Sequence, residues 1–564
     1  MSYSLGIDFG TESGRVLLLD LQDGRELAKT IVRYPHGVMD RTLHISGQNL
    51  SPDWALQDPE DYLYVLQEGI PKVLLESGIN RQEVIGLGVD FTSCTVLPVN
   101  RDGIPLCHLP EFRMHPHAWV KLWKHHAATP IAERMNTVAR EMGASFLSRY
   151  GDRISPEWYF PKLLEVFEED PDVYCATDAF VEAADWIVWY LTGQEKRNSC
   201  TAGYKAFWDE REGLPPEYFF ERLNSQFTNP AEKLGKTFYR MGTRAGYLRA
   251  ELADSLGLHP GVAIAVGNID AHVSVPGVGV NAPGALVMVV GTSICHLTVT
   301  EQEIRLPGIT GIVKDGVLPG YFGYEAGQAA VGDMLAWYVE HAVPTTYLDA
   351  AKKNNISIYE YLEKHATKLY PGASGLLVLD WWNGNRSILG DANLSGVLIG
   401  LTLSTTPVEI YRALLESIAF GTKRIIDNFL EHGVPIEELV ATGGLAWKSP
   451  LLMQIYADVC GLPVTVYDSE EVPGRGAALF GAVAAGKNDG GFATIEEASE
   501  KLRPPLLKQY TPRREAVETY RHLYSMYKLL YSWFGEEQRD ILHNLKHLRG
   551  DQLRKWHDDG LSEP

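Results

Sequence analysis

Residues 5–20, close to the start of the chain, read LGIDFGTESGRVLLLD. Two short β-rich runs flank a segment that contains two glycines, and this pattern is typical of a β-hairpin. We therefore expect a hairpin whose turn carries Gly10 and Thr11. The acidic Asp8 stands inside the first, otherwise apolar, run.

The same pattern recurs at residues 284–299, which read GALVMVVGTSICHLTV. The two segments lie far apart and no fixed short period joins them, so they indicate duplication of a domain plan rather than a solenoid. We expect one unit at 1–282 and a second at 283–490, each opening with a hairpin. Residues 491–564 are expected to form a C-terminal helical extension, because most of this segment reads as amphipathic helix.

Helical and strand-like stretches alternate between the two hairpins. Apolar residues recur at helical spacing over 59–76, whereas 85–90 and 262–267 are short, nearly continuous apolar runs. Such runs are expected of interior strands that helices cover on both faces. The predicted fold class is therefore α/β with mixed sheets.

Composition and charge exclude several classes of protein. The chain has 564 residues, of which 45% are hydrophobic and 22% charged, values close to those of folded, water-soluble proteins. Lys plus Arg number 51 against 72 Asp plus Glu, a net charge of −21 that opposes association with nucleic acid or an anionic membrane. We expect neither as a partner, and any anionic ligand requires a local site.

The cysteines and the N-terminus bear on location. The six cysteines are scattered, without a C-x-x-C pair or a zinc-ligand cluster. No basic segment followed by an apolar one opens the chain, and no apolar run approaches the roughly 20 residues of a membrane helix. These features predict a cytoplasmic protein.

Asp8 is the first candidate for chemistry. Burying an acidic residue in an apolar strand costs several kcal/mol, roughly, unless it is paired or lies near a cation. The backbone N–H groups of Gly10 and Thr11 and the side chains of Ser13 and Arg15 could hold an anion beside it. The arrangement suits a phosphate with Mg²⁺, although an Asp that only completes its own turn remains the alternative.

The second hairpin strengthens the phosphate interpretation. Its turn contains Gly291 and Thr292, in the pattern of the first turn. Two such turns facing each other could hold two phosphates of one nucleotide.

Asp270 follows a predicted buried strand, in the sequence GNIDAH at 267–272. Ligands of α/β proteins bind at the carboxyl ends of such strands, so Asp270 could act as a general base and help to hold Mg²⁺. The alternative is a helix N-cap, for which Asp is a preferred residue. We expect His272 to be structural.

A Gly443-Gly444 turn leads into a predicted helix and then a strand at 464–466. Because glycine has no Cβ, a flat adenine ring could lie against this backbone. The small residues at 473–485 indicate tight helix packing instead.

In this order the motifs resemble the FGGY family of carbohydrate kinases, over about residues 4–490. The matching segments are Asp8–Thr11, Trp186–Gly193, Gly267–Asp270, Gly291–Ser293, Gly443–Ser449 and Gln454–Asp458. The resemblance implies two ribonuclease-H-like domains of the actin-like ATPase type flanking a cleft. It also implies that 1–282 binds mainly sugar and 283–490 mainly ATP.

Site roles follow from the same resemblance. It implies that Asp270 is the catalytic base and that Asp8 and Asp270 hold Mg²⁺. The implied sugar-binding residues are Thr92, Ser93, Lys205, Asp270 and Glu325. The implied nucleotide-binding residues are Gly10, Thr11, Ser13, Arg15, Gly291, Thr292, Gly327, Gly443, Gly444 and Lys448.

Finer features resemble the family members that phosphorylate L-ribulose to L-ribulose 5-phosphate with ATP in L-arabinose catabolism. These features lie at 110–112, 122–124, 155–158, 201–205, 308–311 and 325–328. A kinase for D-ribulose, xylulose, ribitol or glycerol, and an acceptor-free actin-like ATPase, remain alternatives. We also expect a homo-oligomer, a dimer, for which the C-terminal amphipathic segment is the candidate interface.

One position departs from the family pattern. Related kinases usually have an acidic residue two positions after a Trp near the sugar, where this chain has His125 after Trp123. Direct sugar contacts from this loop are therefore in doubt, and Glu111 and Glu325 are candidates to compensate.

Overall fold

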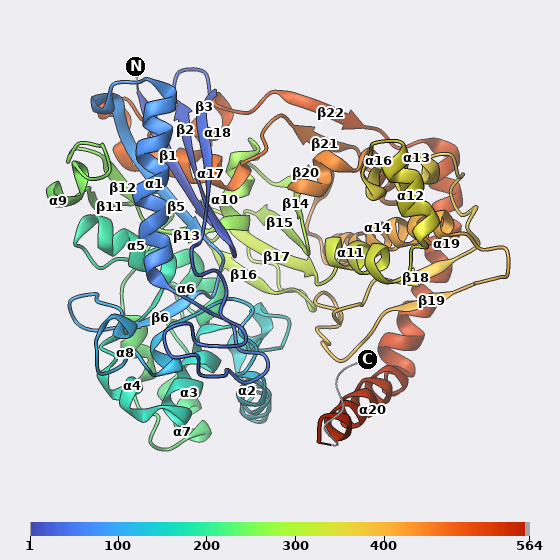
Figure 1. The fold of residues 1–564 in the computed structure, drawn as a ribbon, viewed down its shortest axis with the longest axis horizontal. Helices are drawn as coiled ribbons and strands as arrows, with labels where there is room; N and C mark the ends of the chain where they lie inside the picture. Colours follow the sequence, from blue (N-terminus) through green and yellow to red (C-terminus); the bar gives the residue numbers. More distant parts are fainter. Residues whose placement is uncertain (1, 559–564) are drawn as a thin grey trace.

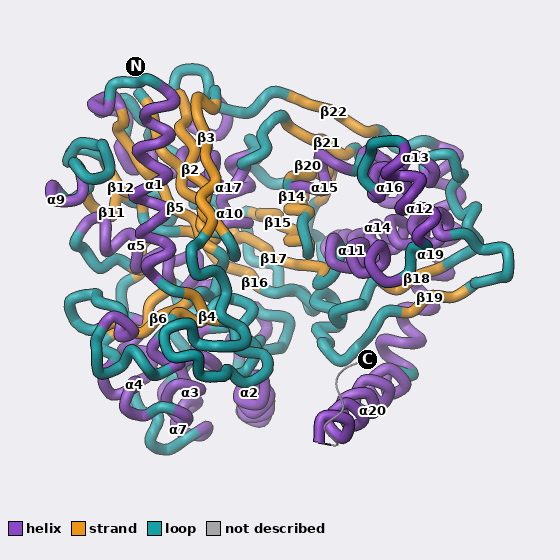
Figure 2. The backbone as a smooth tube through the Cα atoms, viewed as in Figure 1, coloured by secondary structure: helices purple, strands orange, loops and turns teal. Residues whose placement is uncertain are grey.

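The computed structural model describes residues 2–558. Two seven-stranded sheets dominate it, the first at the left of Figure 1 in blue and green and the second near the centre in green to orange. Smaller sheets and helices surround them, as the colouring by secondary structure in Figure 2 shows. The α/β class with mixed sheets is confirmed.

The first sheet has the strand order β11-β12-β5-β1-β2-β3, and β13 also pairs with β5. Its strands are β1 (Tyr3–Phe9), β2 (Ser13–Asp20), β3 (Glu26–Arg33), β5 (Val84–Phe91), β11 (Arg244–Tyr247), β12 (Ala263–Ala265) and β13 (Asn268–Ile269). The strands β1 and β2 form the expected antiparallel hairpin, and β5 runs parallel to β1.

The second sheet has the order β16-β17-β15-β14-β20-β21-β22. Its strands are β14 (Gly284–Val290), β15 (Ile294–Thr300), β16 (Gly311–Lys314), β17 (Phe322–Gln328), β20 (Ile436–Thr442), β21 (Val464–Tyr467) and β22 (Leu506–Tyr510). Each large sheet thus places two parallel strands beside the first strand of a hairpin and ends in an antiparallel edge strand. The expected duplication is present in the topology, and β22 comes from the segment that was expected to be helical.

Helix α1 (Pro59–Ser77) covers one face of the first sheet. It begins after Asp58, whose side chain accepts a hydrogen bond from the Glu60 N–H, and it ends at Gly78 in the left-handed conformation with φ 65°. The helix packs tightly, because a Cβ on Gly14 of β2 would lie 2.5 Å from a methyl group of Val65.

Helix α17 (Val472–Ala485) covers the other face of the first sheet, although it follows the second sheet in sequence. A Cβ on Gly6 would lie 1.7 Å from the carbonyl oxygen of Gly474, and one on Gly88 would lie 1.9 Å from that of Ala477. Only glycine allows the helix backbone to approach these strands so closely. The expected tight packing of 473–485 is confirmed, and it joins the two halves of the chain.

A smaller unit lies beside the first sheet, at the lower left of Figure 1. It contains the sheet β4-β7-β6-β8 and the pair β9–β10: β4 (Leu56–Gln57), β6 (Val96–Val99), β7 (Val120–Lys121), β8 (Ala179–Glu182), β9 (Arg197–Asn198) and β10 (Phe238–Tyr239). Its helices and those along the first sheet are α2 (Thr129–Glu141), α3 (Tyr159–Glu169), α4 (Pro171–Ala176), α5 (Ala183–Thr192), α6 (Ser199–Ala206), α7 (Glu217–Leu223), α8 (Pro230–Leu234), α9 (Ala250–Ala253) and α10 (Asp270–Gly277).

Three helices pack against α14 (Pro407–Glu431), which begins with a capping box formed by Thr406 and Glu409. They are α11 (Gly332–His341), α13 (Ile358–Ala366) and α16 (Pro450–Cys460). The other elements of this half are α12 (Thr345–Lys353), α15 (Gly444–Lys448), α18 (Ile495–Lys501), α19 (Arg514–Ser532) and α20 (Arg539–Asp558), with strands β18 (Leu377–Leu379) and β19 (Val397–Ile399). Among the described residues, none of the helices has the length and apolar character that crossing a membrane requires.

Candidate active site

Three carboxylates meet at one end of the first sheet. Asp8 on β1 pairs in register with Asp90 on the parallel strand β5. The short strand β13 pairs with the same part of β5, and Asp270 follows it as the first residue of α10. Parallel strands end at the same sheet edge, so the topology brings these acids together.

Asp8 and Asp90 are buried and Asp270 is half-buried. Asp8 forms an ion pair with Arg15 at 3.0 Å, and Arg15 also contacts Glu471 at 3.2 Å. Asp90 is fully buried, and no described residue donates a hydrogen bond to either of its oxygens. Burial, together with the charges of Asp8 and Asp270, raises the pKa of Asp90 well above its usual range.

Asp270 is held by its own helix. Its Oδ1 accepts a hydrogen bond from the Ala271 N–H at 2.7 Å. Burial, and then the charge of Asp8, raise the pKa of Asp270 to about 7. A carboxylate of this basicity is better suited to accept a proton than an ordinary Asp.

Lys205 and Glu325 form an ion pair next to this group. Lys205 on α6 and Glu325 on β17 are buried, with Nζ 2.9 Å from Oε2, and both charges act on Asp270. Lys205 and His272 lower the pKa of Glu325 despite its burial, and Glu325 raises that of Lys205. His272 lies 3.5 Å from Glu325, and burial lowers its pKa to about 4.

The expected sugar residues Thr92 and Ser93 follow β5 directly. The Thr92 N–H donates to the Phe9 carbonyl at 3.2 Å, and its hydroxyl lies 2.8 Å from that of Thr95. Both residues are half-buried. They therefore lie beside the same strand end as the carboxylates.

The first turn is held by residues from outside the hairpin. The Tyr34 hydroxyl donates to the Gly10 carbonyl at 2.9 Å, and Gln57 Nε2 donates to the Thr11 carbonyl at 2.7 Å. Trp123 Nε1 donates to Thr11 Oγ1 at 3.1 Å. Ser13 opens β2, with its carbonyl accepting from the Gly10 N–H.

His125 belongs to a core network. It is fully buried, and Nε2 lies 3.0 Å from both oxygens of Glu165, which also pairs with Lys121 at 2.9 Å. Its Nδ1 accepts from the Ala55 N–H. The His at this position therefore connects structural elements, whereas Glu111 is exposed.

The second turn and the Gly-Gly turn lie at one end of the second sheet, because β14 and β20 are parallel neighbours. Gly291 N–H donates to the Ser293 carbonyl, and the Thr292 carbonyl accepts from the Val331 N–H. Gly443 has φ 90°, and a Cβ there would lie 2.7 Å from the Val290 oxygen.

Gly444 differs from its neighbour, since no other atom lies within 4 Å of a Cβ placed on it. It is exposed, as is Lys448 at the end of α15. This open backbone could accept a flat ligand.

Sequence reasoning assigned no role to Asp90 or Arg386. Asp90, like Asp8, is an acidic residue in an apolar run. Its position beside Asp8, however, follows from the register of β1 and β5, which the sequence does not show. Arg386 lies against Gly327, where a Cβ would come within 3.0 Å of its Cδ. Glu157 and Glu325 outweigh burial and raise the pKa of Arg386, which places this guanidinium near the Lys205–Glu325 pair.

Comparison with known proteins gives concordant results. Models of the FGGY family of carbohydrate kinases match the chain at residues 3–277 (N-terminal domain) and 286–485 (C-terminal domain). A ribulokinase of Geobacillus thermodenitrificans is 52% identical, covering 97% of each chain. A ribulokinase of Mycolicibacterium smegmatis is 44% identical, covering 98% of this chain and 97% of the relative.

Solved structures share the fold at low identity. A ligand-bound xylulose kinase from Lactobacillus acidophilus superposes with a TM-score of 0.78 at 18% identity, covering 96% of this chain and 100% of the other. A glycerol kinase from Plasmodium falciparum with ADP has a TM-score of 0.73 at 16% identity, covering 94% and 98%.

Proposed function

Since the chain belongs to the FGGY family of carbohydrate kinases, we propose that it transfers the γ-phosphoryl group of ATP to the terminal hydroxyl of L-ribulose. The products are L-ribulose 5-phosphate and ADP, in L-arabinose catabolism. Relatives named ribulokinase, 52% to 44% identical over nearly the whole chain, support this substrate. The fold is that of the family, with two ribonuclease-H-like domains of the actin-like type.

The observation that carries the proposal is the position of Asp270. It opens α10 directly after β13, and the buried Lys205–Glu325 ion pair acts on its carboxylate. A bare ATPase has no need for a base beside a charged pair, whereas a hydroxylated acceptor needs both. Charged partners for hydroxyl groups also discriminate between epimers, because the wrong epimer leaves them unpaired.

The mechanism assigns each group a task. Lys205, Glu325, Thr92 and Ser93 bind the sugar and orient its terminal hydroxyl toward Asp270. Asp270 Oδ2 accepts the hydroxyl proton as the oxygen attacks the γ-phosphorus, and ADP leaves. Phosphoryl transfer depends on positioning and charge stabilisation, so these tasks account for most of the rate.

The residues also fit a magnesium ion. Asp8, Asp90 and Asp270 offer hard oxygen donors, and the unpartnered oxygens of Asp90 lack a cation. Asp8 and Asp270 would hold the ion. When bound, Mg²⁺ offsets negative charge on the β- and γ-phosphates.

ATP is proposed to contact both turns. The nucleotide-binding set is Gly10, Thr11, Ser13, Arg15, Gly291, Thr292, Gly327, Gly443, Gly444 and Lys448. Gly444 supports the adenine assignment best, because its backbone is exposed and unobstructed.

Three wider predictions accompany this function. The domain limits 1–282, 283–490 and 491–564 stay a proposal. A cytoplasmic location is supported by six free cysteines. A homodimer is supported by α20, where Ile541, Leu545 and Leu548 are 44–57% exposed at helical spacing.

An ADP-release assay tests the function. Mg-ATP is supplied with L-ribulose, D-ribulose, D-xylulose, L-xylulose, ribitol or glycerol, and with no acceptor. We expect the highest kcat/KM with L-ribulose. Preference for another acceptor would replace the substrate but keep the mechanism, and turnover equal to the blank throughout would favour an acceptor-free ATPase.

A further inference from the structure

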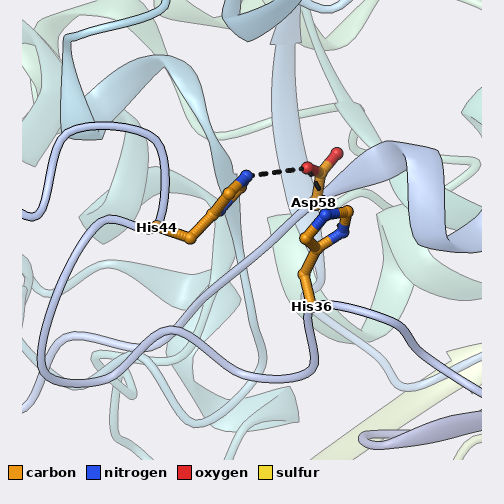
Figure 3. A group of neighbouring side chains, drawn as sticks. All are labelled: His36, His44 and Asp58. Atoms are coloured by element: carbon orange, nitrogen blue, oxygen red, sulfur yellow. Dashed lines mark ion pairs between the residues drawn. The ribbon is translucent and has the colours of Figure 1, made fainter.

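Two histidines and an aspartate, none of them among the three carboxylates described above, converge at the start of helix α1 (Figure 3). His36 and His44 come from the loop after β3, and Asp58 is the residue before α1. One ligand atom from each lies within 4.8 Å of the others. Asp58 Oδ2 is 3.3 Å from His44 Nε2 and 3.6 Å from His36 Nδ1.

These separations match the edges of a metal tetrahedron. Zinc binds imidazole nitrogen and carboxylate oxygen at about 2.0–2.2 Å, so ligand atoms around a tetrahedral ion lie roughly 3.3–3.6 Å apart. Both contacts to the Asp58 oxygen fall at these values. Asp58 and His44 therefore need little rearrangement to receive an ion, whereas His36 Nδ1 first has to exchange its hydrogen bond with Asp61.

A neighbouring backbone group orients the carboxylate ligand. Asp58 Oδ1 is occupied by the Glu60 N–H at 2.9 Å, which leaves Oδ2 directed toward the histidines. Asp61 Oδ1 lies 2.7 Å from the same Nδ1 of His36, so an incoming ion has to displace this hydrogen bond.

The ring of His44 directs one nitrogen toward each side of the cluster. Its Nε2 lies 3.3 Å from Asp58 Oδ2. Its Nδ1 faces the Met39 sulfur, leaving Nε2 for an ion.

We propose that His36, His44 and Asp58 form a binding site for a zinc-class transition-metal ion, distinct from the magnesium carboxylates. Two imidazoles and one carboxylate favour zinc over magnesium, which prefers oxygen ligands. Three protein ligands leave one position for water.

The bound ion stabilises the loop at 34–58 against α1. This loop carries Tyr34 and Gln57, whose side chains bond the carbonyls of Gly10 and Thr11. By holding this loop, the metal site would stabilise the two hydrogen bonds that Tyr34 and Gln57 make to the first turn. It is a structural site, and the inference does not depend on the identity of the sugar.

Zinc titration of chelator-treated full-length protein in magnesium-free buffer tests the site. We expect one equivalent to bind the unmodified protein and to raise its Tm. Asp58→Asn keeps a good N-cap but loses the charged ligand, and His44→Ala loses an imidazole. Both variants should bind zinc at least about 10-fold more weakly, because even changes to residues that only hold the ligands typically lower metal affinity by about 10- to 100-fold.

His522→Ala is the matched control, since this histidine is exposed on α19. It should bind zinc as the unmodified protein does. Cobalt substitution gives a second readout, since a tetrahedral site produces strong visible absorption that Asp58→Asn should remove. Equal zinc binding by Asp58→Asn and the unmodified protein, or no zinc binding by the latter, would overturn the proposal.

Discussion

Lys205 Nζ lies 2.9 Å from Glu325 Oε2, and this buried ion pair joins helix α6 of the first half to strand β17 of the second. Neither residue is near the other in sequence, and each was expected separately to contact sugar. Under the proposed assignment, a sugar hydroxyl meets two opposite charges already held in place. The site is thus assembled only when both halves are folded together.

Removing one charge tests this pair. Glu325→Gln should raise KM for the sugar by about 10- to 100-fold, because a hydrogen bond to a charged group is worth roughly 1.5–3 kcal/mol. Steady-state kinetics with varied sugar measures the change, and a thermal melt checks folding. Glu437→Gln, an exposed change on β20, serves as control. An unchanged KM would remove Glu325 from the sugar site.

The open backbone at Gly444 leads to a prediction about ATP. Gly444→Leu should raise KM for ATP about 10-fold by filling the space proposed for adenine, with little effect on KM for the sugar. Gly550→Leu is the control, since Gly550 also has open space around it but lies on α20. If the Gly444 variant keeps its KM for ATP, adenine binds elsewhere.

Asp90 provides a test of the magnesium assignment. Asp90→Asn keeps the size of the side chain but removes a carboxylate beside Asp8 and Asp270, so several-fold more Mg²⁺ should be needed for half-maximal rate. Titrating Mg²⁺ at saturating ATP and sugar measures this. The exposed Asp172→Asn serves for comparison. An identical Mg²⁺ requirement would show that Asp90 takes no part.

Glu303 is expected to contribute to the loss of stability at low pH. Arg211 at 2.6 Å and Arg149 at 3.0 Å outweigh burial and lower the pKa of Glu303 to about 2. The pKa of Glu303 is lower in the folded protein than the ordinary value of 4.5. The charged side chain therefore adds to the free energy of unfolding above pH 4.5, and this contribution is lost as the pH falls toward 2. Glu303→Gln should therefore lower Tm at pH 7, and its difference from the unmodified protein should narrow below pH 4.5.

Melting curves of Glu303→Gln at pH 7 and at acid pH follow this difference. Glu301→Gln, an exposed change in the same loop, is the control. A difference that is constant with pH would mean that the charge of Glu303 is not responsible.

Local patterns predicted much of the fold. Both hairpins, helix α1 and the strand that precedes Asp270 are local features, since turn glycines and apolar spacing specify them. The close approach of α17 to the first sheet was predicted only as tight packing. Its main partner strands, β1 and β5, end at Phe9 and Phe91, far from α17 in the sequence, and no local pattern identifies them.

Sequence reasoning missed Asp90 and Arg386 for the same reason, because their neighbours in the site come from distant parts of the chain. Asp90 acquires its neighbours through the parallel pairing of β1 and β5, which one chain does not specify. Arg386 comes from the loop between β18 and β19, which form a separate two-stranded sheet. His125 was noted as a departure from the family, but only its burial against Glu165 explains why a histidine stands there.

The most direct test concerns Asp270. Asp270→Asn should retain ATP binding within about threefold while kcat falls by about 10²- to 10⁴-fold, because the substitution removes the proton acceptor and leaves the nucleotide contacts. Parallel measurement of nucleotide binding and of kcat with L-ribulose, with the exposed Asp254→Asn as control, separates the two effects. Turnover near that of the unmodified enzyme would contradict the assignment of Asp270 as the base.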